Sequence, residues 1–157
     1  MAVRRLENTE KRLDRSPEVK TLYQGTIHQY LDKEYVHKVS DPSRDDKAWY
    51  LPHFPIVRPD KSTTKVRIVF DALATFKGTS LNQSIHQGPK LQRELPDVLL
   101  RFRRNPVALI CDISEMYLQI KIAAEDRCFF RFLWRDLHTE QLPEVYEFER
   151  VVFVLRF

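Results

Sequence analysis

The spacing of apolar residues changes part way along this chain, and that change limits its fold more than any other feature. Up to Leu31, residues such as Val19, Leu22 and Tyr23 recur every three or four positions, which is typical of amphipathic helices. From about residue 49 onward, short runs such as residues 65–71 alternate apolar and polar side chains, which favours strands. The order contains no repeated strand–helix–strand unit, so the sequence predicts an α+β fold.

The individual elements can be assigned from these patterns. Helices are expected over residues 3–13, 17–31 and 91–102, with Ser16 capping the second and Pro96 starting or restarting the third. Extended segments are expected over residues 49–57 and 65–71, around a hairpin tip at 60–64. A strand is expected over residues 107–111, followed by an antiparallel pair at 127–135 and 145–153.

Composition places the chain among globular proteins. It has 157 residues, of which 43% are hydrophobic, enough for one domain with a core. No apolar run could cross a bilayer, and the amino terminus lacks the apolar stretch of a secretory signal. Cys111 and Cys128 lie in apolar runs and are expected to be reduced core residues, with a disulfide between them as the alternative. These features favour an intracellular, cytoplasmic protein, with the nucleus as the alternative compartment.

Most common catalytic signatures are missing from the sequence. No pair of cysteines has metal-ligand spacing, the histidines are scattered, and three glycines cannot build a phosphate-binding loop. The remaining candidate is Asp112, which follows the apolar run 107–111. It either caps the turn that begins at Ser114 or is a carboxylate that a strand end holds for chemistry. Glu115 is either a metal ligand beside Asp112 or a solvent-facing charge.

Basic residues gather in two segments, although the net charge is only +4. One holds Arg58, Lys61, Lys65 and Arg67, and the other holds Arg101, Arg103 and Arg104. Each segment is either a solvated face or part of a track for a nucleic acid.

Several blocks of the sequence, taken in order, resemble a known family. They are YLPHFPIVRPDKSTTKVRIVFDA, SLNQSI, GPKLQ, DVLLRFRRNPVALICDISEMYLQI, DRCFFRFLWR and FERVVF. Together they resemble the reverse transcriptase of BEL/Pao-type LTR retrotransposon polyproteins over about residues 50–153. The resemblance implies a right-hand polymerase fold behind an N-terminal helical segment at residues 1–40. A partial reverse transcriptase domain would then occupy 41–157, with fingers at about 41–90 and 120–150 and the start of the palm at about 91–119 and 151–157.

The resemblance also implies roles for residues around the first palm strand. Asp112 matches the first catalytic aspartate, which in the family holds two Mg²⁺ ions that activate the primer hydroxyl and stabilise the leaving pyrophosphate. The backbone carbonyl of Ile113 matches a further metal ligand. Tyr117 matches the aromatic steric gate that excludes a ribose 2′-hydroxyl, and otherwise would be an ordinary core tyrosine.

Residues of the fingers are implied to bind the incoming nucleotide. Arg67 matches the arginine that contacts the triphosphate, where a planar fork suits paired oxygens. Either Lys61 or Lys65 matches the fingertip lysine, and their spacing does not decide between them. The implied partners are an RNA or DNA template-primer and deoxynucleoside triphosphates, with no membrane. The oligomeric state stays open.

The chain departs from the family in one catalytic respect. The second family motif, a tyrosine followed one residue later by two aspartates, does not occur in the sequence. Val154 and Arg156 stand where the family usually has glycine and asparagine. We therefore expect a truncated fragment of an RNA-directed DNA polymerase with an incomplete active site and weak or absent Mg²⁺ binding. The alternatives are a non-catalytic nucleic-acid-binding or structural remnant of a retroelement, and a general α+β interaction module.

Overall fold

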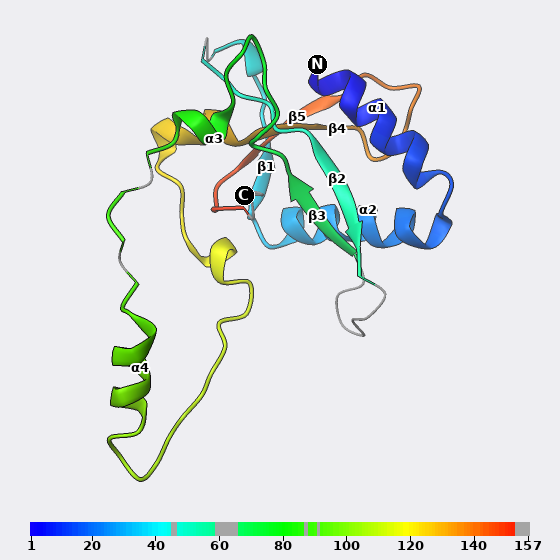
Figure 1. The fold of residues 1–157 in the computed structure, drawn as a ribbon. Helices are drawn as coiled ribbons and strands as arrows, with labels where there is room; N and C mark the ends of the chain where they lie inside the picture. Colours follow the sequence, from blue (N-terminus) through cyan, green and yellow to red (C-terminus); the bar gives the residue numbers. More distant parts are fainter. Residues whose placement is uncertain (45–46, 59–65, 87, 91, 153–157) are drawn as a thin grey trace.

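Two small antiparallel sheets organise the protein, which is described here as a computed structural model (Figure 1). The structure describes residues 1–44, 47–58, 66–86, 88–90 and 92–152. One sheet has the order β1-β5-β4, formed by β1 (Val36–Lys38), β5 (Glu144–Phe148) and β4 (Arg131–Trp134). The other is a pair, β2 (His53–Val57) and β3 (Val66–Phe70). With the helices around them, these sheets confirm the coarse α+β class.

The two amino-terminal helices that the sequence predicted are present, and they pack against the sheets. They are α1 (Ala2–Leu13) and α2 (Pro17–Asp32). Leu6 and Leu13 of α1 and Tyr23 and Ile27 of α2 are all buried, and each pair keeps helical spacing. Ser16 occupies the N-cap position of α2, but its side chain makes no capping hydrogen bond.

The core joins the two sheets through aromatic rings. The ring centroid of Phe70 on β3 lies 5.1 Å from that of Phe132 on β4 and 4.7 Å from that of Phe148 on β5. The pairs are edge-on, an arrangement that the charge distribution of aromatic rings favours. β1 pairs with β5 from Val36 to Lys38, so the predicted helical segment 1–40 shares a sheet with the predicted fingers.

Short helices link the sheets to the rest of the chain. They are η1 (Pro42–Arg44), α3 (Leu81–Ser84), η2 (Met116–Gln119) and η3 (Ala124–Phe130), of which α3 is α-helical and the others 3₁₀. Ser80 and Gln83 form a capping box at α3. Because η3 occupies residues 124–130, β4 begins at Arg131, four residues later than the sequence predicted.

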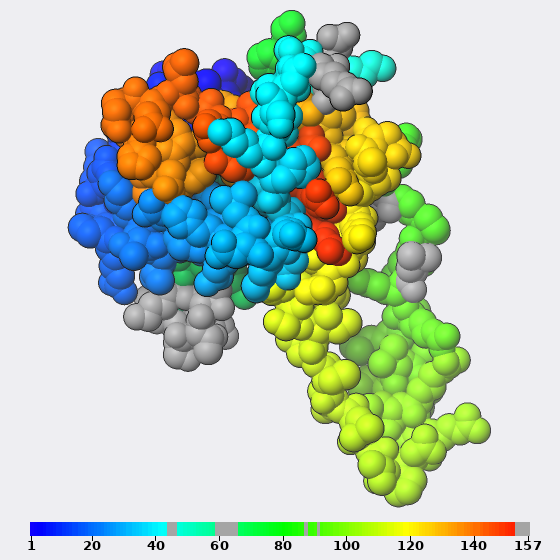
Figure 2. Space-filling model, turned by 180° about the vertical axis from the view of Figure 1, so that it is seen from behind, coloured from blue at the N-terminus to red at the C-terminus, as the bar shows by residue number. Residues whose placement is uncertain are grey.

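An arm extends from this body, formed by residues 88–90 and 92–114 (Figure 1). It contains α4 (Leu95–Phe102), a helix that the sequence predicted, with Pro96 in its first turn. None of its residues is buried, and the return path from α4 to η2 is exposed as well. Figure 2 shows the arm from behind, as a yellow-green projection from the rest of the molecule.

The predicted strand at residues 107–111 is wrong. Within the described part of the chain, residues 105–113 belong to no helix or strand, and their N–H groups donate to no backbone carbonyl. Leu109 and Ile110 are 89% and 88% exposed. A strand forms when neighbouring strands satisfy its backbone and a packed layer covers its side chains, and this segment has neither. Cys111 is consequently exposed rather than in the core, and no disulfide joins it to Cys128.

Candidate active site

The arm carries Asp112 and Ile113 away from the folded body. Both residues lie on the irregular path that returns from α4, and both are exposed. Asp112 was expected at the carboxyl end of a strand, where a sheet would hold its carboxylate. That placement is wrong for the same reason that the strand is wrong, because no sheet continues to residue 112 in the described chain.

Tyr117 lies where the arm rejoins the body. It sits in η2 beside Leu118, which is buried, while Tyr117 itself is 46% exposed. The Ile120 N–H donates to the Tyr117 carbonyl at 3.1 Å and closes the turn. The phenol ring is therefore carried by an anchored turn, unlike Asp112.

Glu115 binds residues from the end of α2. Each of its carboxylate oxygens lies 2.9 Å from Lys33 Nζ, and Oε2 also accepts a hydrogen bond from the Tyr35 hydroxyl at 3.0 Å. The Lys33 ammonium holds the pKa of Glu115 below its usual value and is itself raised in pKa by this carboxylate. The two sequence interpretations, a metal ligand or a solvent-facing charge, both missed this ion pair.

Arg67 occupies the exposed position of β3. Its neighbours Val66 and Ile68 are buried, so the strand alternation directs the guanidinium away from the core. Ile56 of β2 is its cross-strand partner. Lys61 and Lys65, the two candidates for the fingertip lysine, lie outside the described residues. In Figure 1 the β2–β3 pair and the arm lie apart, so the strand that carries Arg67 and the path that carries Asp112 do not come together.

The described residues do not form a magnesium site. Among them, no three histidine, cysteine, aspartate or glutamate side chains come close enough to share a metal ion. Asp112 is one carboxylate, and Glu115 is engaged by Lys33 and Tyr35. Since Mg²⁺ requires an octahedral shell of oxygen ligands, this donor set does not fit the ion as it stands. Magnesium stays a prediction for a complete domain.

The second basic segment lies on the arm. Arg101 is in the last turn of α4, and Arg103 and Arg104 follow it; all three are exposed. Exposed apolar residues share this helix: Leu95, Val98, Leu99, Leu100 and Phe102. The arm is therefore both basic and apolar on its surface.

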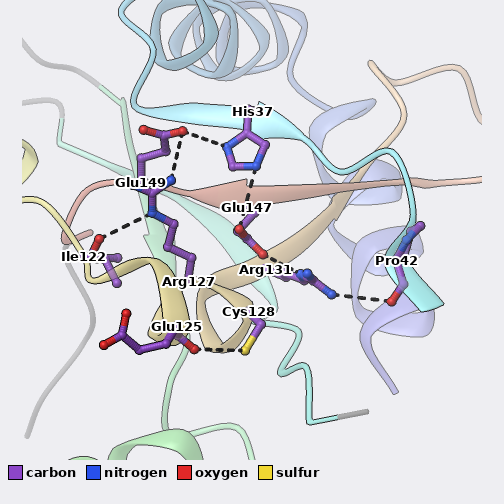
Figure 3. A network of polar contacts seen from close by, with 9 residues as sticks. All are labelled: His37, Pro42, Ile122, Glu125, Arg127, Cys128, Arg131, Glu147 and Glu149. Carbon is purple, nitrogen blue, oxygen red and sulfur yellow. Dashed lines mark hydrogen bonds and ion pairs between the residues drawn. The ribbon is translucent and has the colours of Figure 1, made fainter. Parts of the chain in front are cut away.

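A polar network that the sequence did not reveal crosses β1 and β5 (Figure 3). His37 lies 3.7 Å from a Glu147 oxygen and 3.2 Å from a Glu149 oxygen. Arg131 pairs with Glu147 at 2.7 Å, and Arg127 pairs with Glu149 at 3.2 Å. Each carboxylate thus already has an arginine partner, so the network joins strands rather than offering ligands to a metal.

A buried histidine is another polar feature that the sequence patterns missed. His53 accepts a hydrogen bond from the Tyr23 hydroxyl at Nδ1 and donates from Nε2 to the Leu133 carbonyl at 2.8 Å. Thr9 donates to the His53 carbonyl at 2.9 Å. Burial lowers the pKa of His53 to about 4, so the ring is neutral near pH 7 and serves the core.

Comparison with known proteins adds no assignment. No protein-family model matches the chain, and no curated protein matches it. Among the described helices, none has the length and apolar character needed to span a membrane.

Proposed function

We propose that this chain supplies the fingers and the start of the palm of a reverse transcriptase, an RNA-directed DNA polymerase. The proposal starts from the ordered sequence blocks that resemble that family. The observation that carries it further concerns residues 107–111, whose sequence pattern is typical of a buried strand although the segment forms no strand and is exposed. This run has the side chains of a buried strand, yet Leu109 and Ile110 are almost fully exposed. A palm sheet is the kind of partner that would pair with such a run and bury it.

The β2–β3 hairpin supports the same proposal, because it carries a residue suited to binding the incoming nucleotide. Buried residues on either side of Arg67 fix the backbone, while the guanidinium faces outward. A guanidinium held in this way can donate two parallel hydrogen bonds to phosphate oxygens, which a lysine cannot do with the same geometry. Arg67 would thus bind the triphosphate once a palm brings the nucleotide to the hairpin.

In this proposal the chain does not polymerise alone. Two-metal phosphoryl transfer requires several carboxylates around the ions, and among the described residues no three acidic, histidine or cysteine side chains gather to hold one. The Tyr-x-Asp-Asp pattern that supplies the others in the family does not occur in the sequence. Asp112 would take up its place when the strand before it pairs with further palm strands.

A second candidate function is nucleic-acid binding without catalysis. The observation that favours it is the exposed cluster of Arg101, Arg103 and Arg104 at the end of α4. Three adjacent cations on an exposed helix end suit contacts to a phosphate backbone and carry no sequence preference. This function needs no palm and no metal.

A fusion protein separates the two functions. A family palm segment containing Tyr-x-Asp-Asp is joined after Val152, and extension of a primed RNA template is measured with Mg²⁺ and deoxynucleotides. The polymerase proposal predicts extension by the fusion and loss of several orders of magnitude in Asp112→Asn, with template binding retained. Asp126→Asn, which changes an exposed acid of η3, is the matched control and should extend like the parent. A fusion that binds the template and never extends it would favour the non-catalytic function.

A further inference from the structure

Glu115 is the point at which the returning arm first binds the body. Before it, residues 105–113 donate to no backbone carbonyl within the described chain. At Glu115, three hydrogen bonds form at once, two from Lys33 at 2.9 Å and one from Tyr35 at 3.0 Å. Glu115 therefore marks the boundary between the exposed residues 105–113 and the anchored turn that follows.

Of the two donors, Tyr35 belongs to the buried core and Lys33 lies at the end of α2. Lys33 is the C-cap residue of α2, and its ammonium lies 5.7 Å from the ring centroid of Tyr35. The Tyr35 ring lies 6.4 Å from that of Tyr30, which in turn lies 6.2 Å from the Phe148 ring of β5. Glu115 is thus connected through two tyrosines to the central sheet.

The backbone of Glu115 has an uncommon conformation at the point where its side chain is bound. Its φ of 53° and ψ of 39° are left-handed, a conformation that residues with a Cβ adopt at a cost. The left-handed residue turns the chain from the irregular arm into η2. There Leu118 is buried, and the Ile120 carbonyl accepts from the Val151 N–H at 2.9 Å.

We propose that Glu115 is a positioning residue, clamped by Lys33 and Tyr35, through which the N-terminal helical segment fixes the turn that carries Tyr117. The clamp ends the arm, so that residues 105–114 can rearrange while Tyr117 stays in place against the body. Any effect of the clamp on catalysis rests on the proposed function, because Tyr117 acts as a steric gate only in a reverse transcriptase. The clamp itself does not depend on that function.

Hydrogen exchange of the unmodified chain and its variants tests the clamp, and needs no polymerase activity. Exchange is followed by mass spectrometry in peptides covering residues 114–122 and, as an internal reference, in peptides covering β4 and β5. Glu115→Gln keeps the shape and removes the charge, and Lys33→Met removes the donor. Each should raise exchange in residues 114–122 by about tenfold, the factor expected for losing hydrogen bonds to a charged group. The reference peptides should not change.

Two further variants distinguish positioning from a general loss of stability. Lys33→Arg keeps a charged donor and should restore slow exchange, while the double variant Lys33→Met with Glu115→Gln should exchange no faster than either single variant. Lys90→Met, which breaks the exposed pair with Glu94 at 2.6 Å, is the matched control and should have no effect on residues 114–122. Unchanged exchange in Glu115→Gln, or faster exchange that includes β4 and β5 equally, would overturn the proposal.

Discussion

Arg135 binds Glu10 through two hydrogen bonds of 2.8 and 2.5 Å, and this pair joins the end of β4 to α1 across 125 residues of sequence. Their side chains are only 10% and 3% exposed. The Glu10 carboxylate raises the pKa of the Arg135 guanidinium, so the arginine stays charged near pH 7. The N-terminal helix is therefore an integral part of the fold around the sheets.

Arg135→Met should lower the free energy of unfolding by about 3 kcal/mol, because it leaves the Glu10 carboxylate buried without its partner. Urea denaturation at neutral pH measures this. Lys90→Met breaks the exposed pair with Glu94, whose side chains are 65% and 69% exposed, and should cost less than about 1 kcal/mol. Equal losses of unfolding free energy in the two variants would show that the buried pair stabilises the fold no more than the exposed pair.

His53 should make the stability depend on pH between about 4 and 6.5, the values that bound its titration in the folded and unfolded chain. Its pKa is lowered by burial, so within this window the unfolded chain binds a proton that the folded chain does not. Stability is therefore fully present above pH 6.5 and falls as the pH drops, by at most about 3 kcal/mol. Urea midpoints measured from pH 7 to pH 5 should follow this slope.

A pair of variants identifies the group responsible for the pH slope. In His53→Gln the slope should flatten, whatever the loss of overall stability, while the exposed His138→Gln should retain it. The fold lowers the pKa values of the acidic groups Glu115, Asp136 and Glu144 from ordinary values of 4.5, 3.8 and 4.5, which already lie below the pH 5 limit of these measurements. A steep slope that survives in His53→Gln would contradict the assignment.

Because Leu109 is exposed, we expect the fold to tolerate a polar substitution there, which is unusual within an apolar run. Leu109→Gln should change the free energy of unfolding by no more than about 0.5 kcal/mol, because the side chain is already in water. It should also reduce self-association, since an exposed apolar run with an unpaired backbone invites pairing between chains. Thermal unfolding and light scattering measure the two effects. Phe132→Ala, in the core, should cost about 3 to 5 kcal/mol as the comparison. A large loss of stability in Leu109→Gln would mean that the segment is buried after all.

Binding of single-stranded RNA should weaken with salt if the arm contacts phosphates. Replacing Arg101, Arg103 and Arg104 with alanine should reduce the slope of log affinity against log salt by roughly 2, since each lost phosphate contact removes about 0.7 from the slope for a single strand. Lys11, Arg12 and Arg15 are exposed on or just after α1, and replacing these three with alanine is the matched control. Equal slopes in the two triple variants would assign the arm arginines to a solvated face.

Local spacing was enough to predict much of this fold. The helical repeat of Leu6, Leu13, Tyr23 and Ile27 depends on neighbours within a few turns, and α1 and α2 are found where it indicated. The alternation around Arg67 likewise predicted β3 and its antiparallel partner β2. In these elements, apolar residues whose spacing predicted the helix or strand are also buried in the core.

The residues that the sequence placed wrongly or missed depend on distant partners. An apolar run at residues 107–111 becomes a strand only beside other strands, and its composition cannot show whether they are present. Glu115 lies 82 residues from Lys33, and His53 lies 30 residues from Tyr23. No local pattern contains such pairs, because the fold alone brings them together.

The central proposal is that this chain holds the fingers and the first catalytic aspartate of a polymerase, and Tyr117 offers its most direct test. The fusion with a family palm segment is supplied with a primed RNA template and either deoxynucleotides or ribonucleotides, and primer extension is measured. The parent fusion should incorporate deoxynucleotides alone, because in the proposed function the Tyr117 ring would block a 2′-hydroxyl. Tyr117→Val should admit ribonucleotides while keeping measurable deoxynucleotide incorporation, and Asp112→Asn should abolish both. Extension that is equal in the parent and in Asp112→Asn, or sugar selection that is unchanged in Tyr117→Val, would contradict the claim.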